Sequence, residues 1–175
     1  MLPVGGITNG AVHVLGFNYG ARQYGRVREG IRIISIGAFV TGLLMTIMTL
    51  VIPGLLIKIF NSDAELISKG IEAFRIYFVA FFFMAMQLAG QAVSQALGRA
   101  KTAIFFSMLR KAIVCGPLTI ILPRLFNLGP WGVFIAEPIS DFIGGVSCFL
   151  TMIFAVYIPL GKKMKEDLLI DAIND

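Results

Sequence analysis

Apolar residues form long uninterrupted runs in this chain, and charged residues are confined to short blocks between them. Charge-free runs of at least 20 residues cover residues 1–21, 33–57, 76–98 and 142–161. Each run reaches the ~20 apolar residues that a helix needs to cross a bilayer core. The pattern predicts an all-α membrane protein, a polytopic helical bundle within a single transmembrane domain, residues 1–175.

The runs predict four full membrane spans and the end of a fifth. The full spans are residues 33–58, 76–97, 105–123 and 133–159, and the partial span is residues 1–20. The third is the least marked, because the apolar stretch 112–123 alone gives only ~18 Å of helix. It must extend back through residues 105–109, which puts Arg110 and Lys111 some way inside the span or at its inner mouth. We expect these two side chains to anchor the span at the inner membrane surface. Residues 160–175 form the predicted tail.

The amino-acid composition supports a membrane protein and excludes several classes of function. Hydrophobic residues make up 57% of the 175 residues and charged residues 14%, against about 45–50% and about 25% in soluble domains. A soluble globular enzyme is therefore excluded. The sequence contains no Walker A loop, HExxH or GxSxG motif, so we expect no enzyme and no ATP hydrolysis. We expect no cofactor and no metal site, since His13 is the chain's single histidine. The first partner is the lipid bilayer.

The distribution of Lys and Arg predicts the topology. Blocks rich in basic residues alternate with poorer ones along the chain, and the net charge is +5. Because short cytoplasmic loops carry the Lys/Arg excess, the loops 22–32 and 99–111 and the C-terminal tail are predicted to be cytoplasmic. The protein is expected to be multi-pass in the plasma (inner) membrane. Nucleic acid is not an expected partner, because no basic stripe is separable from the spans.

Amide side chains follow one face of the second span. Gln87, Gln91 and Gln95 are spaced four residues apart, with Ser94 beside them, so the amides lie on the same side of a helix. In a membrane they need partners or water. Two interpretations remain open: hydrogen bonds between helices, or a cavity wall that contacts substrate.

Glu137 and Asp141 are the acidic residues inside the predicted spans, and they share a helix face. An intramembrane acid is a functional candidate by default, and this pair suits a site for a coupling ion, H⁺ or Na⁺. The alternative is structural. If Pro138 stood in the first turn of the helix, both carboxylates would lie near its positive N-terminal end, close to water.

Several motifs, taken in order, resemble the multidrug and toxic compound extrusion (MATE) transporters. Asn9-Gly10-Ala11 and the string GFNYGA at residues 16–21 resemble a helix-end motif of that family. Four further segments also resemble MATE sequences: QAVSQALGRA at 91–100, SMLRK at 107–111, WGV at 131–133 and EPISD at 137–141. Asn9 and His13 depart from the family pattern, which has Gln and Pro there.

The resemblance implies a twelve-helix antiporter of two six-helix lobes. Such a protein exports drugs or other cationic or amphipathic compounds in exchange for H⁺ or Na⁺ by alternating access. This chain would correspond to the end of the eighth helix through the twelfth, so the N-terminal lobe of the transporter is an implied partner. The alternatives are a lipid-linked oligosaccharide flippase of the same broad superfamily and a non-transporting membrane fragment.

Overall fold

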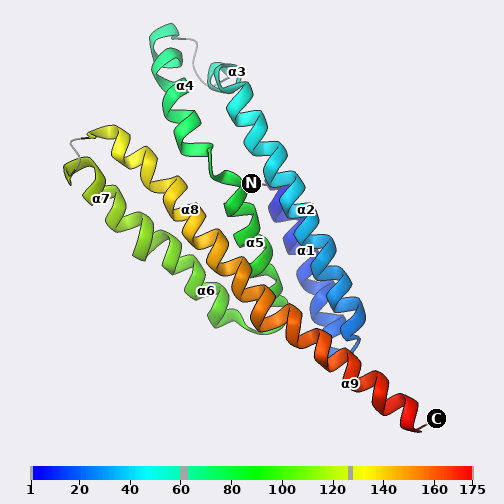
Figure 1. Ribbon diagram of the computed structural model, residues 1–175. Helices are drawn as coiled ribbons and strands as arrows, with labels where there is room; N and C mark the ends of the chain where they lie inside the picture. The colour runs from blue at the N-terminus through cyan, green and yellow to red at the C-terminus, as the bar shows by residue number, and fades with distance from the viewer. Residues whose placement is uncertain (1, 60–62, 126–127, 175) are drawn as a thin grey trace.

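The computed structural model describes residues 2–59, 63–125 and 128–174, and within these ranges the regular elements are helices (Figure 1). Most of them run side by side in one elongated bundle. The first half contains α1 (Leu2–Gly20), α2 (Tyr24–Val51), α3 (Pro53–Lys58), α4 (Ala64–Phe78) and α5 (Phe81–Ala96). The second half contains α6 (Ala100–Met108), the π-helical η1 (Leu109–Cys115), α7 (Gly116–Leu125), α8 (Pro130–Met152), the π-helical η2 (Ile153–Tyr157) and α9 (Ile158–Asn174).

The helices confirm the predicted class of all-α polytopic membrane protein. In the described ranges three continuous helices are long and apolar enough to cross a membrane: Tyr24–Val51, Ala100–Arg124 and Pro130–Asp167. A fourth span results if α4 and α5, which meet at a 40° bend, are taken together. These helices overlap the four predicted full spans, and α1 lies where the partial span was expected.

The two basic segments predicted as loops are mainly helical, which corrects the sequence interpretation. α2 already begins at Tyr24 and α6 at Ala100, so only residues 21–23 and 97–99 connect the helices there. Arg and Lys favour helix, so a span can continue beyond the apolar core as a charged helix end. The true turns are marked by Arg22 and Gly98, whose φ angles are 58° and 73°. The predicted tail is likewise helical, because α9 continues α8 through η2.

Small residues allow the helices to pack closely around α5. A Cβ on Gly145 of α8 would lie 2.3 Å from the backbone oxygen of Phe83, and one on Gly42 of α2 would lie 2.5 Å from Ala85 Cβ. Only glycine fits such contacts, and small residues at helix interfaces are typical of membrane bundles. α5 is thereby held between α2 and α8.

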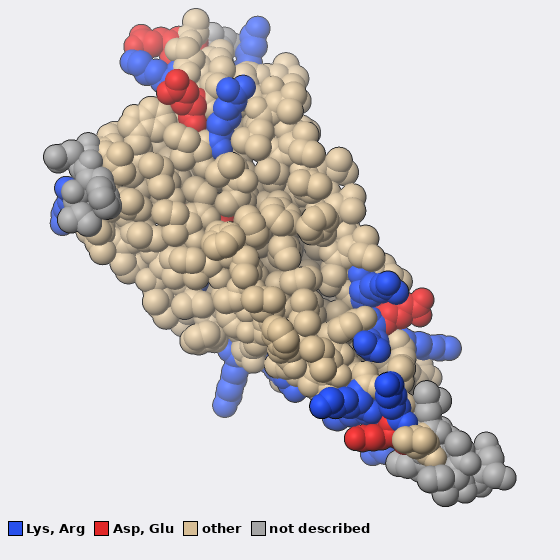
Figure 2. Space-filling model, in the orientation of Figure 1, with Lys and Arg blue, Asp and Glu red and all other residues tan. Residues whose placement is uncertain are grey.

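Charged side chains gather at the two ends of the bundle, and a broad uncharged belt separates them on the face shown in Figure 2. Large apolar side chains on α2 point outward within this belt, including Ile33, Phe39 and Leu44. An exposed apolar surface of this size would be unfavourable in water. It is the surface expected of helices that contact lipid or further helices.

Candidate functional site

Four ionisable side chains from two neighbouring elements meet inside the bundle. Arg110 and Lys111 come from η1, and Glu137 and Asp141 come from α8. Arg110 lies ten residues beyond the start of α6, and Asp141 eleven beyond the start of α8, so both are roughly 15 Å along their helices. This distance along each helix is about half the ~30 Å thickness of a hydrocarbon core. We refer to these four residues as the charge cluster.

Ion pairs and hydrogen bonds connect all members of the charge cluster. The Arg110 guanidinium donates to the Asp141 carboxylate and lies 3.5 Å, Nη1 to Oε1, from Glu137. The same Glu137 oxygen accepts from Lys111 Nζ at 2.6 Å. The other Glu137 oxygen accepts from the Cys115 thiol at 3.2 Å. Glu137 is therefore the shared acceptor at the centre of the cluster.

The charge cluster is buried on one side and open on the other. Asp141 is 1% exposed, Glu137 7% and Arg110 8%, whereas the Lys111 side chain is 54% exposed. Two cations face two anions, so the formal charge is zero. An unpaired charge at this depth would cost several kcal/mol, and mutual pairing offsets much of that cost. The arrangement can hold two carboxylates ionised deep in a span.

This geometry contradicts two structural interpretations drawn from the sequence. Glu137 does not lie in the first turn of its helix, because α8 begins at Pro130 and Pro138 is inside it. Arg110 is not an anchor at the membrane surface, since it is buried and paired with Asp141. The pairing was missed because the third span carries a π-helical segment that no residue pattern signals.

Local backbone features place Arg110 against α8. η1 is π-helical, and such segments are frequent at functional sites because they re-aim side chains. Gly144 of α8 faces the Arg110 stem: a Cβ there would lie 2.9 Å from Arg110 Cβ. The missing side chain at Gly144 therefore makes room for the arginine, one turn from Asp141.

The amide face of α5 contacts the same third span. Gln87 Nε2 donates to the Phe106 carbonyl at 3.1 Å, and Gln91 Nε2 donates to Ser107 Oγ at 3.0 Å. Ser94 is buried and donates to its own helix, whereas Gln95 is exposed. Gln87 Oε1 is buried and has no hydrogen-bond partner among the described residues. Gln87 and Gln91 thus connect α5 to α6. Contact between these amide side chains and a substrate stays a prediction.

The same succession of helices is found in known transporters. Residues 1–121 match the MatE family profile, which is well over half of the chain. The chain belongs to the MatE family. Membership confirms the resemblance seen in the motifs and places the chain among transporters, not enzymes. No curated protein sequence matches the chain.

Solved MATE structures share the fold. The MATE multidrug transporter DinF-BH, solved in complex with R6G, is 31% identical with a TM-score of 0.81, over 89% of this chain and 34% of that one. An inward-facing MATE transporter of the MOP superfamily is 18% identical, with a TM-score of 0.80 over 94% and 37% of the two chains. The bent form of Vibrio cholerae VcmN is 21% identical, with a TM-score of 0.70 over 86% and 33%. The chain thus spans about a third of the length of each.

Proposed function

We propose that this chain is part of a secondary active antiporter that exports drugs or organic cations in exchange for H⁺ or Na⁺. Family membership and the likeness to a MATE multidrug transporter bound to R6G support this proposal. The mechanism would be alternating access, in which two lobes rock about a central site and ion binding favours one state. The second lobe would come from the rest of a transporter about three times as long.

The observation that carries the proposal is the charge cluster at mid-span. A membrane protein retains intramembrane acids and bases at a cost, and they commonly mark ion pathways. Glu137 and Asp141 would serve as ion-coupling residues. Because Arg110 and Lys111 already neutralise them, an incoming H⁺ or Na⁺ would compete with these internal cations. Release of Arg110 or Lys111 from its carboxylate would then favour one of the two arrangements of the lobes.

The amide face supplies the proposed substrate contacts. Gln87, Gln91, Gln95 and Ser94 lie on α5, and the first two hydrogen-bond to the third span. The unpartnered Gln87 oxygen could accept a hydrogen bond from a cationic substrate or from water. Gln95 is exposed at the end of α5 nearest the basic segment, where the other lobe would complete the wall.

A flippase of the same superfamily is the less favoured alternative. A lipid-linked oligosaccharide carries phosphate, so its cavity would need a basic lining, whereas α5 presents uncharged amides. A non-transporting membrane fragment would have no use for ionisable groups inside a span, where charged side chains are costly to bury.

The test is dye efflux from cells that lack their own drug pumps, using the complete protein that carries this sequence. We expect lowered accumulation of a cationic amphipathic dye, reversed by collapse of the ion gradients. The 175-residue chain alone should insert but not export, because one partial lobe cannot enclose a site. Full-length protein at normal abundance with no efflux would contradict the antiporter.

A further inference from the structure

Two hollows follow one another along the seam between α2 and the C-terminal helix. The first, of about 280 Å³, has apolar walls that include Ile36, Phe149 and Ile153. The second, also about 280 Å³, is lined by charged residues, among them Arg28 and Glu29. Arg32 and Tyr157 line both hollows, so the two form one groove with an apolar arm and a basic arm. We refer to it as the α2–α9 groove after the two helices at its basic arm, although its apolar arm lies between α2 and the end of α8 with η2.

Two buried polar atoms along the groove lack partners. Arg28 Nε and Ser35 Oγ are buried, and neither has a hydrogen-bond partner among the described residues. Arg28 lines the basic arm and Ser35 the apolar arm. Buried donors are nearly always satisfied, and leaving one unsatisfied is unfavourable. The unpaired Arg28 donor favours a ligand that brings a hydrogen-bond acceptor to the basic arm.

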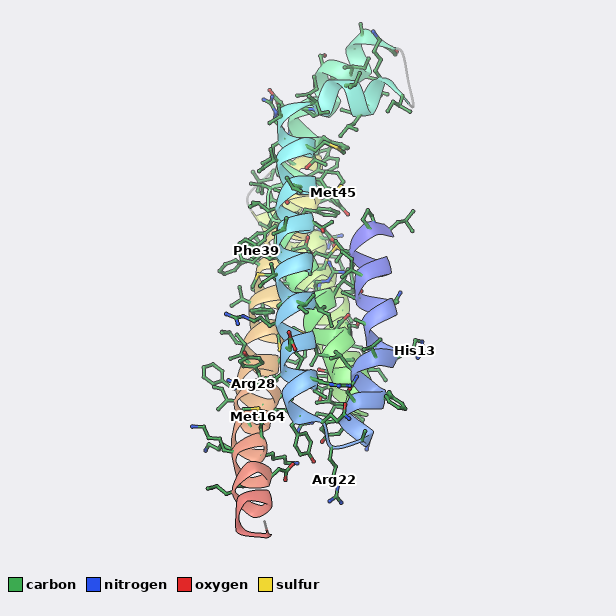
Figure 3. All side chains as sticks on the ribbon, turned by 90° about the vertical axis from the view of Figure 1, so that its right-hand side faces the viewer. His13, Arg22, Arg28, Phe39, Met45 and Met164 are labelled. Carbon is green, nitrogen blue, oxygen red and sulfur yellow. The ribbon has the colours of Figure 1, made fainter. Side chains whose placement is uncertain are left out.

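The Arg28 side chain is fixed in place for such a ligand. Its guanidinium carbon lies 4.5 Å from the centroid of the Tyr157 ring, a cation–π contact. Gly161 leaves room for it, because a Cβ there would lie 3.1 Å from Arg28 Cζ. Figure 3 shows Arg28 and Met164 at the seam between α2 and the C-terminal helix. A guanidinium held in this way is prepared to bind an oxyanion in a defined direction.

We propose that the α2–α9 groove binds an anionic phospholipid. Its phosphate would accept from Arg28 and Arg32, and an acyl chain would lie along Ile36, Phe149 and Ile153. Figure 2 shows Lys and Arg side chains gathered at the end of the bundle from which the C-terminal helix extends. Basic pockets between spanning helices suit anionic head groups. The apolar arm distinguishes a lipid from a free phosphate ion, which would have no use for it.

Native mass spectrometry of the complete protein, released from vesicles of equal parts phosphatidylglycerol and phosphatidylcholine, tests the proposal. Wild type should retain phosphatidylglycerol in preference to phosphatidylcholine. The double variant Arg28→Gln/Arg32→Gln should lower this retention about tenfold, since charge-assisted hydrogen bonds are lost. Millimolar inorganic phosphate should not displace the lipid.

Arg26→Gln is the matched control, because Arg26 lies on the same turn of α2, is exposed and does not line the groove. It should change retention less than ~twofold. Arg32→Gln alone, at an exposed side chain, replaces the double variant if the latter does not fold. Ser35→Leu fills the apolar arm without changing charge and should also lower retention. Equal loss from Arg26→Gln and Arg32→Gln, equal binding of both lipids, or full displacement by phosphate would overturn the proposal.

Discussion

Arg110 and Asp141 form a buried ion pair that joins the third span to the fourth. They are 31 residues apart in sequence. Arg110 belongs to the segment SMLRK and Asp141 to the segment EPISD. The pair fixes the position of η1 on α8 at mid-span, with Glu137 one turn away as a second acceptor. Both the stability of this half of the bundle and its proposed response to ions depend on this contact.

The losses from removing Arg110 and Asp141 should not add, because each residue is the partner that neutralises the other. Asp141→Asn or Arg110→Gln alone leaves a buried charge with a weakened partner and should destabilise the protein by about 3–5 kcal/mol. The double variant should lose clearly less than the sum of the two single losses. Thermal unfolding of the complete protein in detergent measures the three values. Additivity within ~0.5 kcal/mol would show that the residues are not coupled.

Close packing of α8 on α5 predicts a second stability effect. Gly145→Ala places a methyl group against the Phe83 backbone oxygen, and the helices must separate. Overpacking of this kind costs about 1–3 kcal/mol. Gly10→Ala is the control, because a Cβ there meets nothing within 4 Å. A melting temperature that falls equally for both variants would contradict the packing account.

Two variants of the amide face distinguish a residue that stabilises the fold from a residue that contacts substrate. Gln87→Ala removes a buried hydrogen bond to Phe106 and should lower the melting temperature as well as transport. Gln95→Ala alters an exposed side chain, so it should raise the KM for a cationic dye severalfold with the melting temperature unchanged. An unchanged KM in Gln95→Ala would remove that residue from the proposed substrate wall.

Topology can be tested by cysteine labelling in a variant that lacks Cys115 and Cys148. The basic blocks predict that Gly25 is cytoplasmic and Ser68 external, and both positions are exposed. An impermeant thiol reagent added to intact cells should label Ser68→Cys and not Gly25→Cys. The reverse pattern would invert the orientation. Labelling of both would contradict a membrane crossing by residues 33–58, the predicted span that separates the two positions.

The fold class and the presence of membrane spans could be predicted from the sequence, because a helix that crosses lipid needs about 20 apolar residues in a row. Long charge-free runs favour helices, and the structure places helices in all four predicted ranges, with breaks at Ile52 and at residues 79–80. Helix ends were less readable, since basic residues extend a helix beyond the bilayer as readily as they form a loop. The starts at Tyr24 and Ala100 illustrate this limit.

Only the acidic half of the candidate site could be predicted from the sequence. Glu137 and Asp141 stood out because acids are rare in spans, but their partners did not. Arg110 and Lys111 fell where interface anchors are also expected, and their placement against α8 depends on η1 and on Gly144. A π-helical segment and a close helix crossing are properties of tertiary packing, which periodicity alone does not contain.

The most direct test of the account is ion-driven dye transport by the purified complete protein in proteoliposomes. With a Na⁺ or H⁺ gradient imposed, wild type should move a cationic dye against its gradient. Asp141→Asn should lower the rate about tenfold at equal protein content and flatten its dependence on pH or Na⁺, and Glu137→Gln should do less. The exposed Glu72→Gln should behave as wild type. Wild-type ion dependence in Asp141→Asn would contradict a coupling role for the charge cluster.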